Sequence, residues 1–166
     1  METNEALFNT QALLQVDGTM IERLKALAER SPTLRFRLCL HRSTEDAVQE
    51  MIVVHCRHNY SRPNAHSVPL TYLVLEGTLR VLFFNDEGAV RSSTDLGPFV
   101  GGKPFALRIE PGHWYMPICI SQQVVFFETQ AGPFRRDVMN RWAPWSPAED
   151  DAAGIAAYRR RLGLPG

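Results

Sequence analysis

Short apolar runs that alternate with turn residues dominate the middle of the chain, from residue 50 to residue 129. The runs are rich in Val, Ile, Phe, Tyr and Leu, and turn residues such as Glu76-Gly77 and Pro111-Gly112 separate them. This pattern is typical of half-buried β-strands. Many short strands at this spacing indicate a β-sandwich or a closed antiparallel barrel such as a jelly roll. The expected strands cover residues 34–41, 51–58, 72–76, 79–84, 89–94, 105–109, 115–120 and 124–129.

A helix is expected before these strands, at residues 18–31. Apolar residues recur there at helical spacing, and Thr19 and Glu22 have the spacing of a capping box. Ser31-Pro32 should end the helix, because the residue before a proline avoids the helical region. The chain therefore starts with a helical arm that leads into the β-rich part.

A second helix is expected after the strands, at about residues 147–162. Ser146-Pro147-Ala148-Glu149 combines an N-cap, a proline at the first helical position and the acid of a capping box. Gly163 is suited to the C-terminal end of this helix. With a barrel at about residues 34–134 between the two helices, residues 1–166 are interpreted as one all-β domain with short terminal helices.

Composition excludes some classes of function. Lys and Arg together number 18, as do Asp and Glu, so the formal net charge is zero. This balance argues against a broad electrostatic surface for nucleic acid or an anionic membrane. No apolar run is long enough to span a bilayer. Three isolated cysteines without a CxxC pair favour reduced thiols and a cytoplasmic protein; they are Cys39, Cys56 and Cys119.

Residues 60–77 carry a recognisable motif. Tyr60-Ser61-Arg62-Pro63-Asn64-Ala65-His66, followed by Tyr72-Leu73-Val74-Leu75-Glu76-Gly77, resembles the first motif of cupins, specifically of the WbuC-type cupin family. The resemblance covers roughly residues 20–147. It implies a cupin-type antiparallel β-barrel, a homodimer, and a setting in surface-polysaccharide or nucleotide-sugar metabolism. Further segments that resemble the family lie at residues 35–41, 46–51, 128–134 and 143–145.

The resemblance also implies a metal site that is degenerate in this chain. A cupin metal site takes two histidines and a glutamate from the first motif and a third histidine from the second motif. A neutral amide is a poor metal ligand, and a phenol must first lose a proton of pKa about 10. One ligand of the four is retained, so no cofactor is expected. The corresponding positions are, in order, Asn64, His66, Leu70 or Thr71, and Tyr115.

A divalent metal remains an alternative through His113. This residue precedes Tyr115 by two positions, so on a strand both side chains would face the same side. His66 and His113 would then be the metal ligands, assisted by Asn64 and Tyr115. Against this alternative, His113 directly follows the Pro111-Gly112 turn, where a side chain can point to solvent.

The inside of the barrel is the expected binding site. Residues at alternate strand positions face the same side, which places Asn64 and His66 in the lumen, and Tyr115 is expected beside them. His66 is either a structural histidine bonded to Asn64 or Tyr115, or a general base that anchors a ligand. His55 and His58 have opposite parity on one strand and are therefore not a ligand pair.

Charged residues extend the candidate site. Glu128 either pairs with an arginine at the barrel rim or supplies a carboxylate for acid–base chemistry. Arg57 is a candidate ligand-binding residue, because with Arg35 and Arg37 it could ring the mouth of the barrel. The planar fork of arginine is suited to phosphate or carboxylate. Ordinary surface ion pairs are the alternative role for these arginines.

Three functions are compatible with these patterns. The first is binding of a small polar or sugar-like ligand in the lumen, without a conventional cupin metal. The second is a metal-independent isomerase or epimerase acting on a sugar nucleotide, with His66 and Tyr115 as the catalytic acid–base pair. The third is a non-catalytic structural or regulatory subunit. The sequence does not decide whether the protein is an enzyme.

Overall fold

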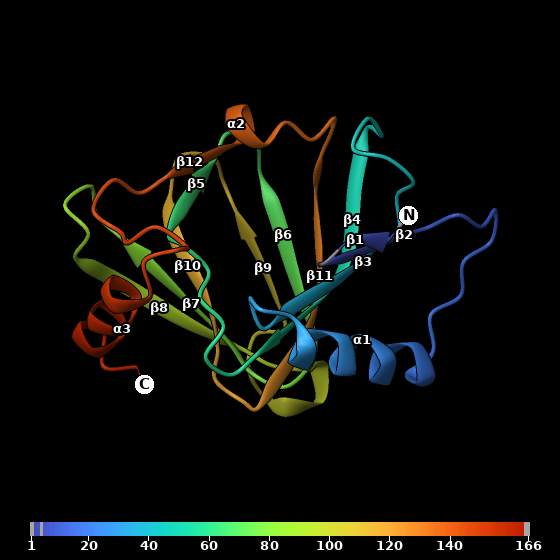
Figure 1. Cartoon of the computed structure of the whole chain (residues 1–166), viewed down its shortest axis with the longest axis horizontal. Coiled ribbons are helices and arrows are strands. Elements are labelled where there is room, and N and C mark those ends of the chain that lie inside the picture. The colour runs from blue at the N-terminus through green and yellow to red at the C-terminus, as the bar shows by residue number, and fades with distance from the viewer. Residues whose placement is uncertain (1, 4, 165–166) are drawn as a thin grey trace.

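A computed structural model describes residues 2–3 and 5–164 of the chain, and its strands form two sheets that enclose a common core (Figure 1). One sheet contains, in spatial order, β1 (Glu2–Thr3), β2 (Ala6–Phe8), β3 (Arg35–Cys39), β4 (Val48–Cys56), β11 (Gln123–Ala131), β6 (Leu70–Glu76) and β9 (Ala106–Ile109). The other contains β12 (Asn140–Trp142), β5 (Asn64–His66), β10 (Trp114–Cys119), β7 (Leu79–Phe84) and β8 (Val90–Leu96). The helices are α1 (Gly18–Arg30), the 3₁₀ turn η1 (Phe99–Gly101), α2 (Arg136–Met139) and α3 (Ala152–Arg161).

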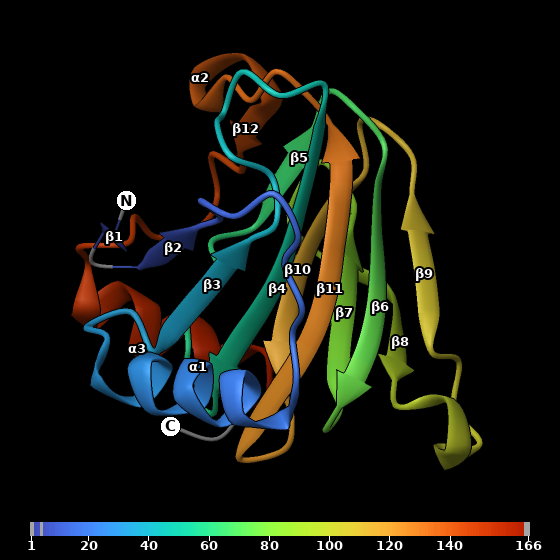
Figure 2. The same ribbon diagram turned by 90° about the vertical axis from the view of Figure 1, so that its right-hand side faces the viewer.

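The strands pair mainly antiparallel, which confirms the predicted all-β antiparallel barrel of jelly-roll type. The long strands β4, β11 and β6 lie side by side in the larger sheet, as Figure 2 shows. The pair β2–β3 departs from the prediction, because these two strands run parallel. Sequential strands are distributed between the two sheets, so residues far apart in the sequence meet inside the barrel.

Each sheet is covered on its outer face by a terminal segment. Leu24 and Ala28 of α1 pack with Phe36 of β3 on the larger sheet. Tyr158 of α3 packs with Trp114 of β10 on the smaller sheet. The two helices thus cover the outer faces of the sheets, and the inner faces of the two sheets line the lumen.

The lumen has an apolar part and a polar part. The core inside it includes Leu79, Val81, Leu96 and Val124, each with 0% of its surface exposed. The polar side chains of β4, β5 and β11 lie on the same inner faces as this core and line a cavity. The apolar residues hold the two sheets together and so fix the positions of the polar ones.

The first helix begins at Gly18, as predicted, but its capping residue differs from the prediction. Asp17, and not Thr19, is the N-cap, and its carboxylate accepts a hydrogen bond from the backbone N–H of Met20 at 2.9 Å. The expected capping box of Thr19 and Glu22 is therefore wrong. The C-terminal end at Ser31 is confirmed, where the backbone N–H donates to the carbonyl of Leu27.

The last helix is shorter than predicted. It starts at Ala152, after the N-cap Asp151, and not near residue 147. Ser146 does not cap a helix, because its hydroxyl donates to the Ala143 carbonyl at 2.8 Å and accepts from Arg62 Nε at 3.1 Å. The predicted end near Gly163 is confirmed, since this glycine has a φ of +67° just after the helix.

Several short elements lie outside the expected strands. The strands β1, β2, β5 and β12 have three residues or fewer, and α2 has four. The pair β5–β12 extends the smaller sheet beyond the predicted barrel limit at residue 134. Among the described residues, no helix has the length and apolar character needed to cross a membrane.

Candidate ligand site in the barrel lumen

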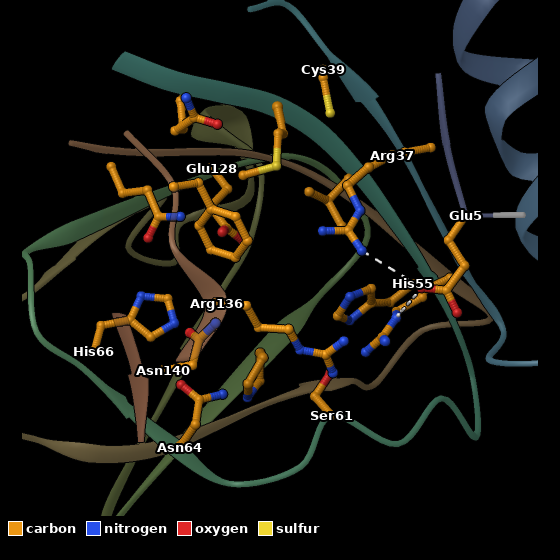
Figure 3. Close-up of a pocket in the computed structure, with 18 of the residues that line it drawn as sticks. Glu5, Arg37, Cys39, His55, Ser61, Asn64, His66, Glu128, Arg136 and Asn140 are labelled. Atoms are coloured by element: carbon orange, nitrogen blue, oxygen red, sulfur yellow. Dashed lines mark hydrogen bonds and ion pairs between the residues drawn. The ribbon is translucent and has the colours of Figure 1, made fainter. Parts of the chain in front are cut away.

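A cavity of about 400 Å³ occupies the polar part of the lumen. Both sheets contribute to its walls, together with the loop before β5 and the segment from residue 134 to residue 149 (Figure 3). A volume of this size lies within the range of small-molecule sites. The barrel thus contains a space that a sugar-sized molecule can fill.

The three predicted lumen residues line this cavity together. Asn64 lies opposite Tyr115 in the β5–β10 pairing, which brings the two motifs into direct contact. The ring of His66 lies edge to face against that of Tyr115, with 5.7 Å between ring centroids. Among the described residues no hydrogen bond links His66 to Asn64 or Tyr115, which differs from the structural role considered for His66.

Four buried polar atoms on the cavity walls have no hydrogen-bond partner among the residues that the structure describes. They come from both halves of the lumen and from three different strands, β4, β5 and β11. Buried polar atoms of this kind normally have a partner, because an unmade hydrogen bond costs about 1–3 kcal/mol. The four atoms are His55 Nδ1, Asn64 Oδ1, His66 Nδ1 and Gln130 Oε1.

Both lumen histidines are neutral at physiological pH. Burial lowers the pKa of His66 to about 4, and the neighbouring Gln130 side chain opposes part of this shift. Burial also lowers the pKa of His55 to about 3, and the positive charges of Arg35 and Arg37 add to the effect. A neutral imidazole carries one donor and one acceptor, so each ring can bond a hydroxyl or an anion.

Tyr115 is a protonated phenol that is almost fully buried, with 2% of its surface exposed. Burial raises its pKa above the ordinary value, and the carboxyl of Glu128 adds to the shift. Tyr72 of β6, in the other sheet, contributes a second buried phenol to the cavity, and the two ring centroids are 6.3 Å apart. Tyr115 is therefore suited to donate a hydrogen bond and not to accept a proton.

Glu128 faces the cavity from β11. Burial raises the pKa of its carboxyl, although the positive charges of Arg37 and Arg35 oppose the shift. The expected ion pair at the barrel rim is not found, since no arginine of the described chain lies within ion-pair distance of this carboxylate. Glu128 is thus a lumen group, which agrees with its alternative assignment to the site.

Two predicted site residues lie away from the cavity. Arg57 follows the end of β4 at Cys56, where its backbone N–H donates to the carbonyl of Gln122, and it does not line the cavity. His113 is exposed after the Pro111-Gly112 turn and does not line the cavity either. The assignments of Arg57 to ligand binding and of His113 to a metal are therefore corrected.

The lumen does not provide the donors of a cupin metal site. Within residues 2–3 and 5–164, no three His, Cys, Asp or Glu side chains are placed to hold one ion. Tyr115 keeps its proton, and Asn64 presents an amide. A tight site requires at least three good donors, so the residues present do not fit a divalent cation.

Four arginines at the cavity define its mouth. Arg35 and Arg37 of β3 are among them, as the sequence indicates. Arg62 and Arg136 were not predicted, and both guanidinium groups lie over the ring of Trp142, at 5.8 and 5.7 Å from its centroid. Glu5 and Glu149 lie within ion-pair distance of arginines in this group.

Some residues of the site could have been found from strand parity. His55 shares the parity of Met51 and Val53 on β4, and all three face the lumen, whereas His58 is exposed. Gln130 lies two positions after Glu128 on β11 and faces the same side. The strand of His55 was predicted, and that of Gln130 was predicted up to residue 129, so alternation along the strand carried the signal. No local pattern identifies residues at the mouth such as Arg136.

The fold is an all-β jelly roll, the fold class that cupins share. A domain family described as of unknown function, DUF6016, matches residues 16–96. No match was found among curated proteins. The structure is similar to that of protein SO0799 from Shewanella oneidensis, with a TM-score of 0.56 and 12% identity, over 77% of this chain and 84% of that chain.

Two further similar structures have TM-scores of 0.46. One is a cupin superfamily protein from Desulfitobacterium hafniense, which is 14% identical over 58% of this chain and 76% of its own. The other is an RmlC-like cupin from Methanocaldococcus jannaschii, which is 11% identical over 58% of this chain and 82% of its own.

Proposed function

We propose that the protein binds a small polar, sugar-like molecule in the barrel lumen, without a conventional cupin metal. The proposal rests on the four buried polar atoms that lack a partner in the described chain and line one cavity of about 400 Å³. A ligand with several hydroxyl groups can donate to and accept from these atoms at the same time. Such a ligand would remove the desolvation cost that the unbound lumen carries.

The sugar-like character of the ligand is supported by the chemistry of the walls. Asn64, Gln130 and Asn140 present amides, while His55 and His66 present neutral imidazoles. Amides and neutral imidazoles both donate and accept hydrogen bonds, as sugar hydroxyls do. The resemblance to the WbuC-type cupins, with their setting in surface-polysaccharide or nucleotide-sugar metabolism, points in the same direction.

The properties of His66 and Tyr115 favour a role in binding over a role in acid–base catalysis. The low pKa of His66, about 4, makes the ring a weak base at neutral pH, and the raised pKa of Tyr115 makes the phenol a weak acid. General acid–base catalysis works best with pKa values near the working pH. The carboxyl of Glu128, whose pKa is raised, is the better starting point for any isomerase or epimerase activity.

Calorimetric titration and thermal unfolding with D-glucose, D-mannose and glycerol test the proposal. A ligand specific for the folded state raises the free energy of unfolding, by about 2.7 kcal/mol at a hundred times Kd. We expect saturable binding of a hexose, and loss of this binding in His66→Phe and Asn64→Leu. His113→Phe is the matched control, because His113 lies outside the cavity. Binding that persists in both lumen variants would contradict the proposal.

A further inference from the structure

We propose that the lumen ligand carries an anionic group, a carboxylate or a phosphate, and that Arg37 and Arg136 bind this group at the mouth of the cavity. The inference rests on the proposed binding function and names the chemical class of the ligand. It places the anion at one side of the lumen and the hydroxyl groups of the ligand at the other.

The arginines at the mouth form a chain of ion pairs with too few carboxylates. Glu5 Oε2 lies 3.3 Å from Arg35 Nε and 3.6 Å from Arg37 Nη2. Glu149 lies 3.4 Å from Arg35 and 3.6 Å from Arg136. Three guanidinium groups thus share two carboxylates, and the two outer arginines each have one long contact. A third anion would complete the alternation of charge.

The guanidinium groups of Arg37 and Arg136 have donors available. Neither group donates a hydrogen bond to any atom of the described chain, because their contacts with Glu5 and Glu149 are too long. Each guanidinium carries five N–H donors in a planar fork that matches carboxylate and phosphate. Arg136 also lies over the ring of Trp142, 5.7 Å from its centroid, which restrains the group beside the mouth.

The remaining charges at the cavity do not cancel this surplus. The charged residues along its wall are four arginines, at positions 35, 37, 62 and 136, and three glutamates, at positions 5, 128 and 149. Four positive and three negative charges leave an excess of one positive charge even when all the glutamates are ionised. Glu128 makes no ion pair within the described chain, and its raised pKa reduces its negative charge further.

His55 provides an additional donor close to the arginines. It pairs with Arg35 in the β3–β4 register, is 5% exposed, and its Nδ1 atom has no partner among the described residues. Because the ring is neutral, one of its nitrogens carries a hydrogen and can donate a hydrogen bond to an anion. The ring thus offers the anion a hydrogen bond without adding a second charge.

The two sides of the cavity therefore differ in chemistry. Figure 3 shows Arg37, Arg136 and His55 on one side and His66 and Asn64 on the other. The first group suits an anion, and the second suits neutral hydroxyl or amide groups. A sugar acid or a sugar phosphate combines both kinds of group within a molecule that a cavity of about 400 Å³ can hold.

Calorimetric titration with three matched probes tests this inference: D-glucose, D-glucuronate and D-glucose 6-phosphate. We expect the better of the two anionic probes to bind about ten to a hundred times more tightly than D-glucose, as a charge-assisted pair allows. The comparison of D-glucuronate with D-glucose 6-phosphate distinguishes a carboxylate site from a phosphate site. Arg37→Gln and Arg136→Gln should each reduce this preference, measured as the ratio of the affinities for the anionic probe and for D-glucose, about tenfold.

Arg108→Gln is the matched control, because Arg108 lies on β9, pairs with the exposed Glu110 at 2.6 Å and does not line the cavity. D-glucose binding by the variants shows that their lumen is still folded. Equal affinities of the wild type for D-glucose and both anions would overturn the inference and leave the proposed function standing. Effects of Arg37→Gln and Arg136→Gln no larger than that of Arg108→Gln would also overturn it. The absence of binding by all three probes would overturn both proposals.

Discussion

The imidazole of His66 stands edge to face against the phenol ring of Tyr115, with 5.7 Å between centroids and 69° between ring planes. The contact joins β5, from the first motif, to β10, which follows the Pro111-Gly112 turn. It is a contact of aromatic surfaces and not a hydrogen bond, since Nδ1 of His66 has no partner among the described atoms. The histidine therefore packs through its ring while one polar atom still requires a partner.

This arrangement predicts the effect of replacing His66 by phenylalanine. His66→Phe keeps an aromatic ring against Tyr115 and removes the buried nitrogen, whose unmade hydrogen bond costs about 1–3 kcal/mol. We expect the free energy of unfolding at pH 7.5 to rise by about 1 kcal/mol while hexose binding is lost. Urea unfolding measures the first quantity and calorimetry the second. A large loss of stability would mean that the nitrogen has a partner in the folded protein.

The two lumen histidines, buried His55 and half-buried His66, also predict the dependence of stability on pH. In the folded state the pKa is about 4 for His66 and about 3 for His55, whereas an unfolded histidine titrates near 6.5. Between pH 6.5 and pH 4 the unfolded chain binds protons that the folded one does not, so the free energy of unfolding falls as pH falls. Each histidine contributes a slope of up to about 1.4 kcal/mol per pH unit.

Urea unfolding of the wild type and of His66→Phe at pH 7.5, 6.0 and 5.0 checks this slope. The variant should lose stability less steeply, by the contribution of one histidine. Comparing the two proteins removes the effect of Glu128, whose raised pKa acts in the opposite sense. Parallel curves for the two proteins would show that His66 titrates normally in the folded state.

The raised pKa of Glu128 predicts that a substitution that removes its charge stabilises the folded protein. Its pKa is raised by burial, so its contribution to stability is present at low pH and is lost as pH rises through the folded-state value. Glu128→Gln should therefore stabilise the protein more at pH 8 than at pH 4. Thermal unfolding at both pH values measures the difference. Glu45→Gln is the control, because Glu45 is exposed and pairs with Arg135 outside the lumen.

The parts of the fold that were predictable are those where local pattern and tertiary environment agree. The strand β7 was expected at residues 79–84 and is found there, because an alternating apolar run ends at a turn on each side. Asn64 and His66 were placed in the lumen through the resemblance to the first cupin motif, in which alternate residues of a strand face one side. The inner faces of β4 and β11 follow this rule, although His55 and Gln130 had not been assigned to the site.

The remaining features depend on contacts between distant segments. Ser146 has the local pattern of an N-cap, but its hydroxyl is engaged by Ala143 and Arg62, so the helix starts later. Arg57 has the parity of a lumen residue, but β4 ends one residue before it. Arg136 reaches the cavity because the segment after β11 folds back over the mouth, and no pattern in the sequence shows that path.

The corrected cap of α1 gives a direct comparison of two side chains. Asp17→Ala removes the carboxylate that accepts the Met20 N–H, so it should lower the free energy of unfolding by about 0.5–2 kcal/mol. Thr19→Ala should change it by less than about 0.5 kcal/mol, because Thr19 is not the N-cap. Urea unfolding of both variants decides which residue caps the helix. A larger loss in Thr19→Ala would restore the capping box expected from the sequence.

Gly88, in the turn before β8, packs closely against Trp145 of the C-terminal segment. Its φ is +83°, and a Cβ added there would lie 2.6 Å from Cδ2 of Trp145. Gly112 has nearly the same φ, +84°, but nothing lies within 4 Å of its added Cβ. Gly112→Ala should therefore show the backbone cost alone, roughly 1–2 kcal/mol, and Gly88→Ala should lose about 1–3 kcal/mol more through overlap with the indole. Equal losses in urea unfolding would mean that Trp145 does not pack against this turn.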